Sequence, residues 1–302
     1  RDVLGSRGLG DVYKRQTFIK EVFDRTLSSP DRKVFHDLNP KAEGHWYYEN
    51  ILNLHEKKQT ENPKYGFNYG HFTIADNMSI SDEQLRAVLA TYDRSTVWYA
   101  RDILGKRKAA EGLVYPFFSA GQDTYLFHGS AAGVDGRFYV SIDYGTHNPC
   151  SMGLWVIHEG KALRIRESYF DSRKQRVQRT DEEHYAELER LTKGYYIQAV
   201  CVDPSAASFI ETIRRHGRYQ VIPADNDVLN GIRCVASLMQ AGLVRIHESC
   251  TDSRREFGLY SWDDKAKEDR VVKENDHAMD DIRYFCYTIF APLIRWADWR
   301  AK

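Results

Sequence analysis

The hydrophobic and polar positions of this chain follow two rhythms, and the second begins near Arg137. Strand-like runs are expected at 137–143, 153–158, 162–170, 197–203 and 220–223, and helical patterns at 181–192, 205–215, 227–241 and 277–290. Three strands in succession, followed by alternating helices and strands, indicate an α/β protein with a mixed sheet flanked by helices.

The region from Thr17 to about Gly121 precedes this sheet, and its pattern is typical of helices and loops. A short strand is expected at 33–36 and a helix at 81–92, where Ser79 or Ser81 can cap the first turn and Asp82 and Glu83 suit the positive helix end. Residues 1–16 are rich in glycine and arginine and lack hydrophobic periodicity, which suggests a non-native junction.

Two acidic residues stand where predicted strands end. In the first strand Val140 and Ile142 share one buried face, so Asp143 projects from the other face at the end of the strand. A continuous apolar run at 199–202 is typical of a strand buried on both faces, and Asp203 follows it. Both carboxylates are therefore expected at the carboxyl edge of the sheet, where α/β proteins usually place ligands.

Further acidic residues open the predicted helix at 277–290. Asp276 stands where an N-cap is expected, so its carboxylate should accept hydrogen bonds from the free amides of the first turn. Asp280 lies one turn after His277 on the same face, whereas Asp281 is rotated about 100° further around the helix. The residues alone leave Asp280 and Asp281 both open as the third carboxylate, and Asp281 could instead be simply solvated.

Each acidic residue taken alone has a simpler explanation, because an acid after a strand often caps a turn or the next helix. Two strand-end acids and an acid-rich helix within one α/β unit are harder to explain in that way. Three converging carboxylates suit hard divalent cations such as Mg²⁺, which prefer oxygen ligands. A pair of such ions can activate a water and stabilise the leaving oxygen of a phosphodiester.

Composition limits the classes of function. The 43 basic and 43 acidic residues balance, so any nucleic-acid contact must come from a local basic surface. One such surface is the run Arg173, Lys174, Arg176 and Arg179, for which a solvated loop is the alternative. The five scattered cysteines form no C-x-x-C pair, and no apolar stretch approaches the ~20 residues that cross a bilayer. A secreted or membrane-spanning protein is therefore not expected.

Several phrases of the sequence carry a resemblance to a known family. They are YVSIDYGTHNP at 139–149, VDPSAASFIETIRR at 202–215, IPADNDVLNGIR at 222–233 and VKENDHAMDDIRYF at 272–285. Together these phrases resemble the nuclease domain of tailed-phage large terminases, in the branch that includes the PBSX-like terminases. Upstream, HDLNPKAEGHWYYENI at 36–51 resembles the last part of the terminase motor domain, and EGLVYPFF at 111–118 resembles the segment that enters the nuclease.

The resemblance implies a ribonuclease H-like nuclease domain at 122–302, preceded at 17–121 by a truncated remnant of an ATPase domain. It implies an endonuclease that uses two Mg²⁺ or Mn²⁺ ions to cut concatemeric double-stranded viral DNA during genome packaging. Carried over by motif, the metal ligands fall on Asp143, Asp203 and Asp280, with His277 as an accessory catalytic residue. The implied partners are DNA, the portal protein and the small terminase subunit, in the cytoplasm of a bacterial host.

One departure and two alternatives stand beside this interpretation. The Walker A loop and the acidic Walker B strand of the motor are not found, so an intact ATPase is not inferred. The turn after Asp143 also resembles the first phosphate-binding turn of actin-like and sugar kinases, but no second glycine-rich phosphate turn follows a later strand. The other alternative is a non-catalytic module that docks on the portal, and the three retained acids argue against it.

Overall fold

The computed structural model describes residues 19, 21, 22, 24, 25, 33–41, 45–90, 92, 94, 96–108, 110–130, 133–266 and 268–294. The chain divides into two compact units, Arg1–Asn39 and Pro40–Lys302. In the first unit, residues 33–39 have no regular secondary structure, so the expected strand at 33–36 is wrong. The expected non-native junction at 1–16 lies outside the described residues.

The second unit contains a mixed seven-stranded sheet with the order β1-β7-β4-β3-β2-β5-β6. The strands are β1 Leu126–Phe127, β2 Arg137–Asp143, β3 Cys150–His158, β4 Lys161–Phe170, β5 Ile197–Val202, β6 Val221–Pro223 and β7 Val244–His247. The central β2, β3 and β4 are antiparallel neighbours. β5 and β6 extend the sheet in parallel beyond β2, and β7 and β1 do so beyond β4. The mixed sheet is confirmed. Two of its seven strands, β1 and β7, were not expected.

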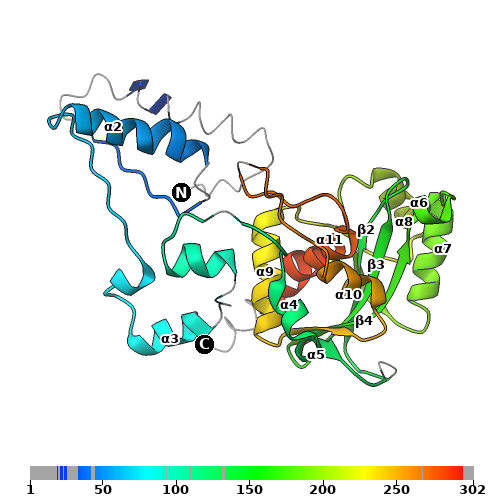
Figure 1. Cartoon of the computed structure of the whole chain (residues 1–302). Helices are drawn as coiled ribbons and strands as arrows, with labels where there is room; N and C mark the ends of the chain where they lie inside the picture. The colour runs from blue at the N-terminus through cyan, green and yellow to red at the C-terminus, as the bar shows by residue number, and fades with distance from the viewer. Residues whose placement is uncertain are drawn as a thin grey trace. The chain divides into compact units, whose positions relative to one another are not determined.

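Helices cover both faces of this sheet (Figure 1). α7 (Asp181–Leu191) and α8 (Ala207–His216) share one core with β2, β3 and β5. α9 (Val228–Gln240), α10 (Thr251–Phe257) and α11 (His277–Tyr284) share the core on the other face. The remaining elements are η1 Tyr48–Leu52, α2 Asn53–Glu61, η2 Ile74–Asp76, α3 Asp82–Ala90, η3 Tyr99–Ile103, α4 Pro116–Ala120, α5 Gln122–Tyr125, α6 Ser172–Gln175 and η4 Phe285–Phe290. In the part of the chain that the structure describes, no helix is both long and apolar enough to span a bilayer.

Strand β2 is buried on both faces, whereas its alternating pattern predicted burial of one face only. Val140 and Ile142 pack in the core beneath α7 and α8. Tyr139 packs in the opposite core, and Ser141 is fully buried beneath α11. The alternation still holds, because Asp143 follows Tyr139 and Ser141 on the α11 face and contacts that helix.

A buried ion pair attaches α11 to the sheet. Asp281 and Arg164 are both fully buried, and two guanidinium nitrogens donate to the two carboxylate oxygens. Ser141 of β2 donates to the same carboxylate at 2.9 Å, and Ser151 of β3 also donates to it. A Cβ at Gly153 would lie 1.7 Å from Arg164 Nη1, so only glycine leaves room for the guanidinium. The alternative that Asp281 is simply solvated is therefore wrong.

We predict that Asp281→Asn destabilises the protein strongly, by about 3–5 kcal/mol, because it leaves the charge of Arg164 buried without a counterion. Guanidinium unfolding monitored by circular dichroism measures the loss. Glu211→Gln is the control, since it removes one partner of the exposed Arg215–Glu211 pair and should leave the free energy of unfolding close to wild type. Equal unfolding midpoints for the two variants would contradict the anchoring role.

Candidate functional site

The structure brings the predicted acidic residues to one edge of the sheet. Ile142 pairs with Val202 across the parallel strands β2 and β5, so Asp143 and Asp203 follow neighbouring positions at the same edge. Asp280 approaches this edge from α11, which packs across β2 and β3. Burial raises the pKa of Tyr284, and the charges of all three carboxylates raise it further, so all three acids lie near this tyrosine.

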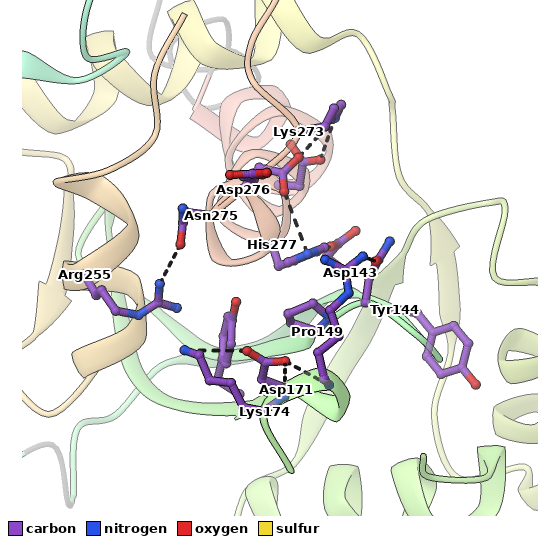
Figure 2. Close-up of a pocket in the computed structure, with 15 residues that line it drawn as sticks. Asp143, Tyr144, Pro149, Asp171, Lys174, Arg255, Lys273, Asn275, Asp276 and His277 are labelled. Atoms are coloured by element: carbon purple, nitrogen blue, oxygen red, sulfur yellow. Dashed lines mark hydrogen bonds and ion pairs between the residues drawn. The ribbon is translucent and has the colours of Figure 1, made fainter. Parts of the chain in front are cut away.

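Asp143 is paired with the histidine of α11. His277 Nδ1 lies 2.8 Å from Asp143 Oδ2, and the two side chains point toward each other in Figure 2. Burial raises the pKa of Asp143 to about 7 against the hydrogen bond from His277, and the charge of Asp280 pushes in the same direction as burial. Burial alone would lower the pKa of His277, but the hydrogen bond to Asp143 raises it. Near neutral pH the two groups are therefore able to share a proton.

Asp203 occupies a more polar environment. Its carboxylate accepts hydrogen bonds from the Ser205 amide at 2.8 Å, the Asn226 side chain at 3.1 Å and the Tyr284 hydroxyl at 2.8 Å. Burial alone would raise the pKa of Asp203, but these hydrogen bonds hold it below its ordinary value. Asp203 is thus ready as a charged oxygen ligand at neutral pH, while Asp143 is easily protonated.

Asp276 does not cap α11, which corrects the expectation from the sequence. Its side chain accepts no hydrogen bond from the first turn. The amide of Ala278 is instead satisfied by Glu256 Oε2 of α10 at 2.6 Å. The Asp276 carboxylate lies 3.4 Å from Lys273 Nζ and 3.8 Å from His277 Nε2. Asp276 is therefore a fourth carboxylate of the site.

A cavity of about 440 Å³ opens beside these groups. It is lined by Asp143, Tyr144, Asn148, Pro149, Tyr169, Asp171, Arg173, Lys174, Arg255, Lys273, Glu274, Asn275, Asp276, His277 and Asp280. In Figure 2 Asp276 and Lys273 lie above His277, while Arg255 of α10, at the left of the view, donates to Asn275. Lys273 had not been singled out, although it lies in the phrase 272–285 that resembles the family. Asp203 does not line this cavity.

No ready-made metal cage exists among the described residues, because no three histidine, cysteine or carboxylate side chains converge closely enough. Each acid has another partner. Asp143 contacts His277, Asp203 accepts from Tyr284, and Asp280 Oδ2 lies 3.5 Å from Lys273 Nζ. The donor set nevertheless fits Mg²⁺ or Mn²⁺, since it offers carboxylate oxygens at one sheet edge and a buried aspartate whose charged form is disfavoured until a cation neutralises it.

The members of the basic run have different surroundings. Arg173 and Lys174 line the cavity, where Arg173 donates to Asn148 and Lys174 lies 3.5 Å from Asp171. Arg179 instead packs its guanidinium 3.9 Å from the centre of the Phe170 ring and 3.9 Å from Glu187. Arg176 follows α6 in the left-handed conformation, with φ of 55°.

Comparison with known proteins agrees with this arrangement. Residues 119–287 match the family model described as the terminase RNaseH-like domain. The large terminase of a thermophilic bacteriophage, in one crystal form, is 36% identical with a TM-score of 0.82, covering 91% of this chain and 66% of that chain. Another crystal form of the same phage protein, in complex with ADP, is 35% identical with a TM-score of 0.81 and the same coverage. The large terminase subunit of Escherichia phage T5 is 26% identical over 157 residues, which are 50% of this chain and 35% of that protein.

Fold and site together define an α/β protein of the ribonuclease H-like class with an acidic cluster at its sheet edge. The chain belongs to the phage large terminase family, since the model of its RNaseH-like domain matches more than half of the residues. It spans about two thirds of the length of the thermophilic-phage relative and about one third of the T5 protein.

The capping arrangement of α11 predicts unequal effects for two acids. Glu256→Gln should cost about 1–3 kcal/mol, because the buried Ala278 amide and Tyr169 hydroxyl both need the carboxylate as acceptor. Asp276→Ala should cost less, since no amide of the first turn depends on its side chain and its ion-pair partner Lys273 is largely exposed. Guanidinium unfolding in EDTA measures both effects. A loss in Asp276→Ala as large as that in Glu256→Gln would contradict this arrangement.

Proposed function

We propose that this chain contains a cation-dependent endonuclease that cuts double-stranded viral DNA during phage genome packaging. The observation that supports this proposal best is the position of Asp143 and Asp203 at the ends of adjacent parallel strands, with Asp280 of α11 facing the same edge. We assign the nuclease to residues 122–302 and regard residues 17–121 as the end of the motor domain. In this proposal the portal protein and the small terminase subunit are the partners in packaging.

The acidic residues of the site suit a pair of Mg²⁺ or Mn²⁺ ions bound by Asp143, Asp203 and Asp280. When bound, such ions supply an activated water and stabilise the leaving oxygen of the phosphodiester. Asp203 contributes a carboxylate that hydrogen bonds keep charged, and Asp143 contributes one that burial leaves ready to exchange a proton. Asp276 offers a further oxygen on the Lys273 side of the cavity.

His277 acts on Asp143 in this proposal. Its Nδ1 lies 2.8 Å from Asp143 Oδ2, so it holds one oxygen of the carboxylate and leaves the other for a cation. Its Nε2 lies on the Asp276 side, 3.8 Å from that carboxylate. The imidazole is therefore placed to accept or return a proton without being required as a metal ligand.

The basic groups around the cavity suit the phosphate backbone of a duplex. Arg173, Lys174, Arg255 and Lys273 all line it, and they offset the acids in a chain without net charge. We propose that Arg173 and Lys174, with Arg176 beside them, contact phosphates and position the duplex without reading bases. Arg179 belongs to the same run but is engaged by Phe170 and Glu187, so it supports the loop instead.

The purified chain should nick and linearise plasmid DNA in Mn²⁺ or Mg²⁺ and not in EDTA. Asp143→Asn, Asp203→Asn and Asp280→Asn should each reduce cutting to the background of the assay, because each change removes a ligand oxygen. His277→Ala should slow cutting roughly 10–100-fold, as expected for a group that orients a ligand. Asp264→Asn, which changes an exposed acid outside the cavity, is the control.

If all three aspartate variants cut DNA at the wild-type rate, the proposed metal site is contradicted. A wild-type chain that binds DNA but never cuts it in either cation would favour the non-catalytic docking module.

Replacing two of the basic side chains that line the cavity should weaken DNA binding by a similar factor for every DNA sequence. The Arg173→Ala, Lys174→Ala double variant should flatten the slope of log affinity against log salt by roughly one unit per lost phosphate contact. Fluorescence anisotropy with two unrelated duplexes measures the slope. The control is the Arg214→Ala, Arg215→Ala double variant, which removes two exposed cations of α8 that do not line the cavity. Equal slopes of log affinity against log salt for the two double variants would indicate that the basic run is a solvated loop without phosphate contacts.

A further inference from the structure

The two oxygens of the Asp280 carboxylate have different surroundings. Arg283, which is only 2% exposed, donates through Nε at 3.2 Å and Nη2 at 3.0 Å, and both bonds reach Asp280 Oδ1. Asp280 Oδ2 instead faces Lys273 beside the cavity. One oxygen is thus clamped from the protein interior, and the other is presented to the site.

Arg283 itself is held by a compact buried cluster. A Cβ added at Gly231 of α9 would lie 2.5 Å from Arg283 Cγ and 2.6 Å from Cδ, so α9 leaves just enough space for the side chain. Tyr115, which precedes α4, and Tyr260, which follows α10, have ring centres 6.2 Å apart. Burial raises the pKa of both tyrosines, and the charges of Asp280 and Arg283 act on each of them, so these four groups are neighbours.

This cluster contains polar atoms that are costly to bury. Among the described residues, Arg283 Nη1 and the hydroxyls of Tyr115 and Tyr260 have no hydrogen-bond partner. An unpaired buried donor or acceptor costs stability, and an apolar replacement of similar shape usually does not. The charge of Arg283 also opposes cation binding at Asp280, because like charges repel. The ion pair with Asp280 offsets part of the burial cost of Arg283, but a charge pair does not require a particular orientation of the carboxylate. The two donors that Arg283 directs at the single oxygen Oδ1 do fix that orientation.

We infer that Arg283 is a positioning residue that fixes the Asp280 carboxylate so that Oδ2 is presented to a divalent cation. The inference rests on the proposed metal site at Asp280. The orientation is set from within the core, through the Arg283 cluster formed by Tyr115, Gly231, Tyr260 and Arg283. Groups that hold a metal-binding side chain in place commonly change metal affinity by about 10–100-fold when they are lost.

Mn²⁺ affinity of the full chain, measured by titration calorimetry and by the Mn²⁺ dependence of plasmid nicking, tests this inference. Arg283→Met should weaken Mn²⁺ binding at least about tenfold, and Arg283→Lys should restore part of the loss. Gly231→Ala keeps every charged group but forces Arg283 to move, so it should weaken Mn²⁺ binding in the same direction while alanine favours the helix. The control is Arg101→Met, which removes an equally buried arginine that pairs with Asp269 and does not line the cavity.

The sign of the change in Mn²⁺ affinity distinguishes a positioning role of Arg283 from a purely electrostatic one. Unchanged or tighter Mn²⁺ binding in Arg283→Met would overturn the inference, because removal of a nearby positive charge alone should strengthen cation binding. A weakening of the same size in Arg101→Met would also overturn it, since the loss would then reflect general destabilisation. If Arg283→Met does not fold, the Mn²⁺ affinity of Gly231→Ala tests the inference instead, and unchanged affinity in that variant would overturn it. A wild-type chain that neither binds Mn²⁺ nor cuts DNA would refute the proposed function itself.

Discussion

The structure depends on a buried ion pair that attaches α11 to the central strands. Asp281 accepts from Arg164 of β4 and from serines of β2 and β3, so a single carboxylate joins the helix to all three antiparallel strands. Breaking such a pair is expensive because it leaves an uncompensated charge in the interior. The position of this carboxylate determines the position of its neighbours on the helix. Asp280 comes to lie at the sheet edge, and His277, one turn earlier, reaches Asp143.

Each aspartate of the proposed metal site has a protein partner in this structure. These partners are a histidine for Asp143, a tyrosine for Asp203, and a lysine and an arginine for Asp280. The two strand-end acids still differ, because hydrogen bonds lower the pKa of Asp203 whereas burial raises that of Asp143. Environments that separate two carboxylates in this way are typical of sites that handle protons.

Much of the architecture could be predicted from the sequence because period-2 and period-3.6 patterns are local. The alternation in β2 indicated the face from which Asp143 projects, and the apolar run before Asp203 indicated a strand buried on both faces. The strand expected at 33–36 was wrong because its residues have strand propensity but pair with no strand among the described residues, and propensity without pairing is weak. Strand β7 was missed, although Val244 and Ile246 alternate with Arg245 and His247 over its four residues.

The sequence by itself determined the α/β class, the two strand-end acids and the acid-rich helix, because each is encoded over a few consecutive residues. Only the tertiary structure decided what each acid of the helix does. Helix α11 is buried on nearly all sides, so its polarity pattern does not reveal which face meets the sheet. Asp281 became the anchor because Arg164 lies beneath it, and Asp276 was free for the site because Glu256, distant in sequence, caps the helix. Such long-range partners are invisible to local patterns, since they depend on which elements pack together.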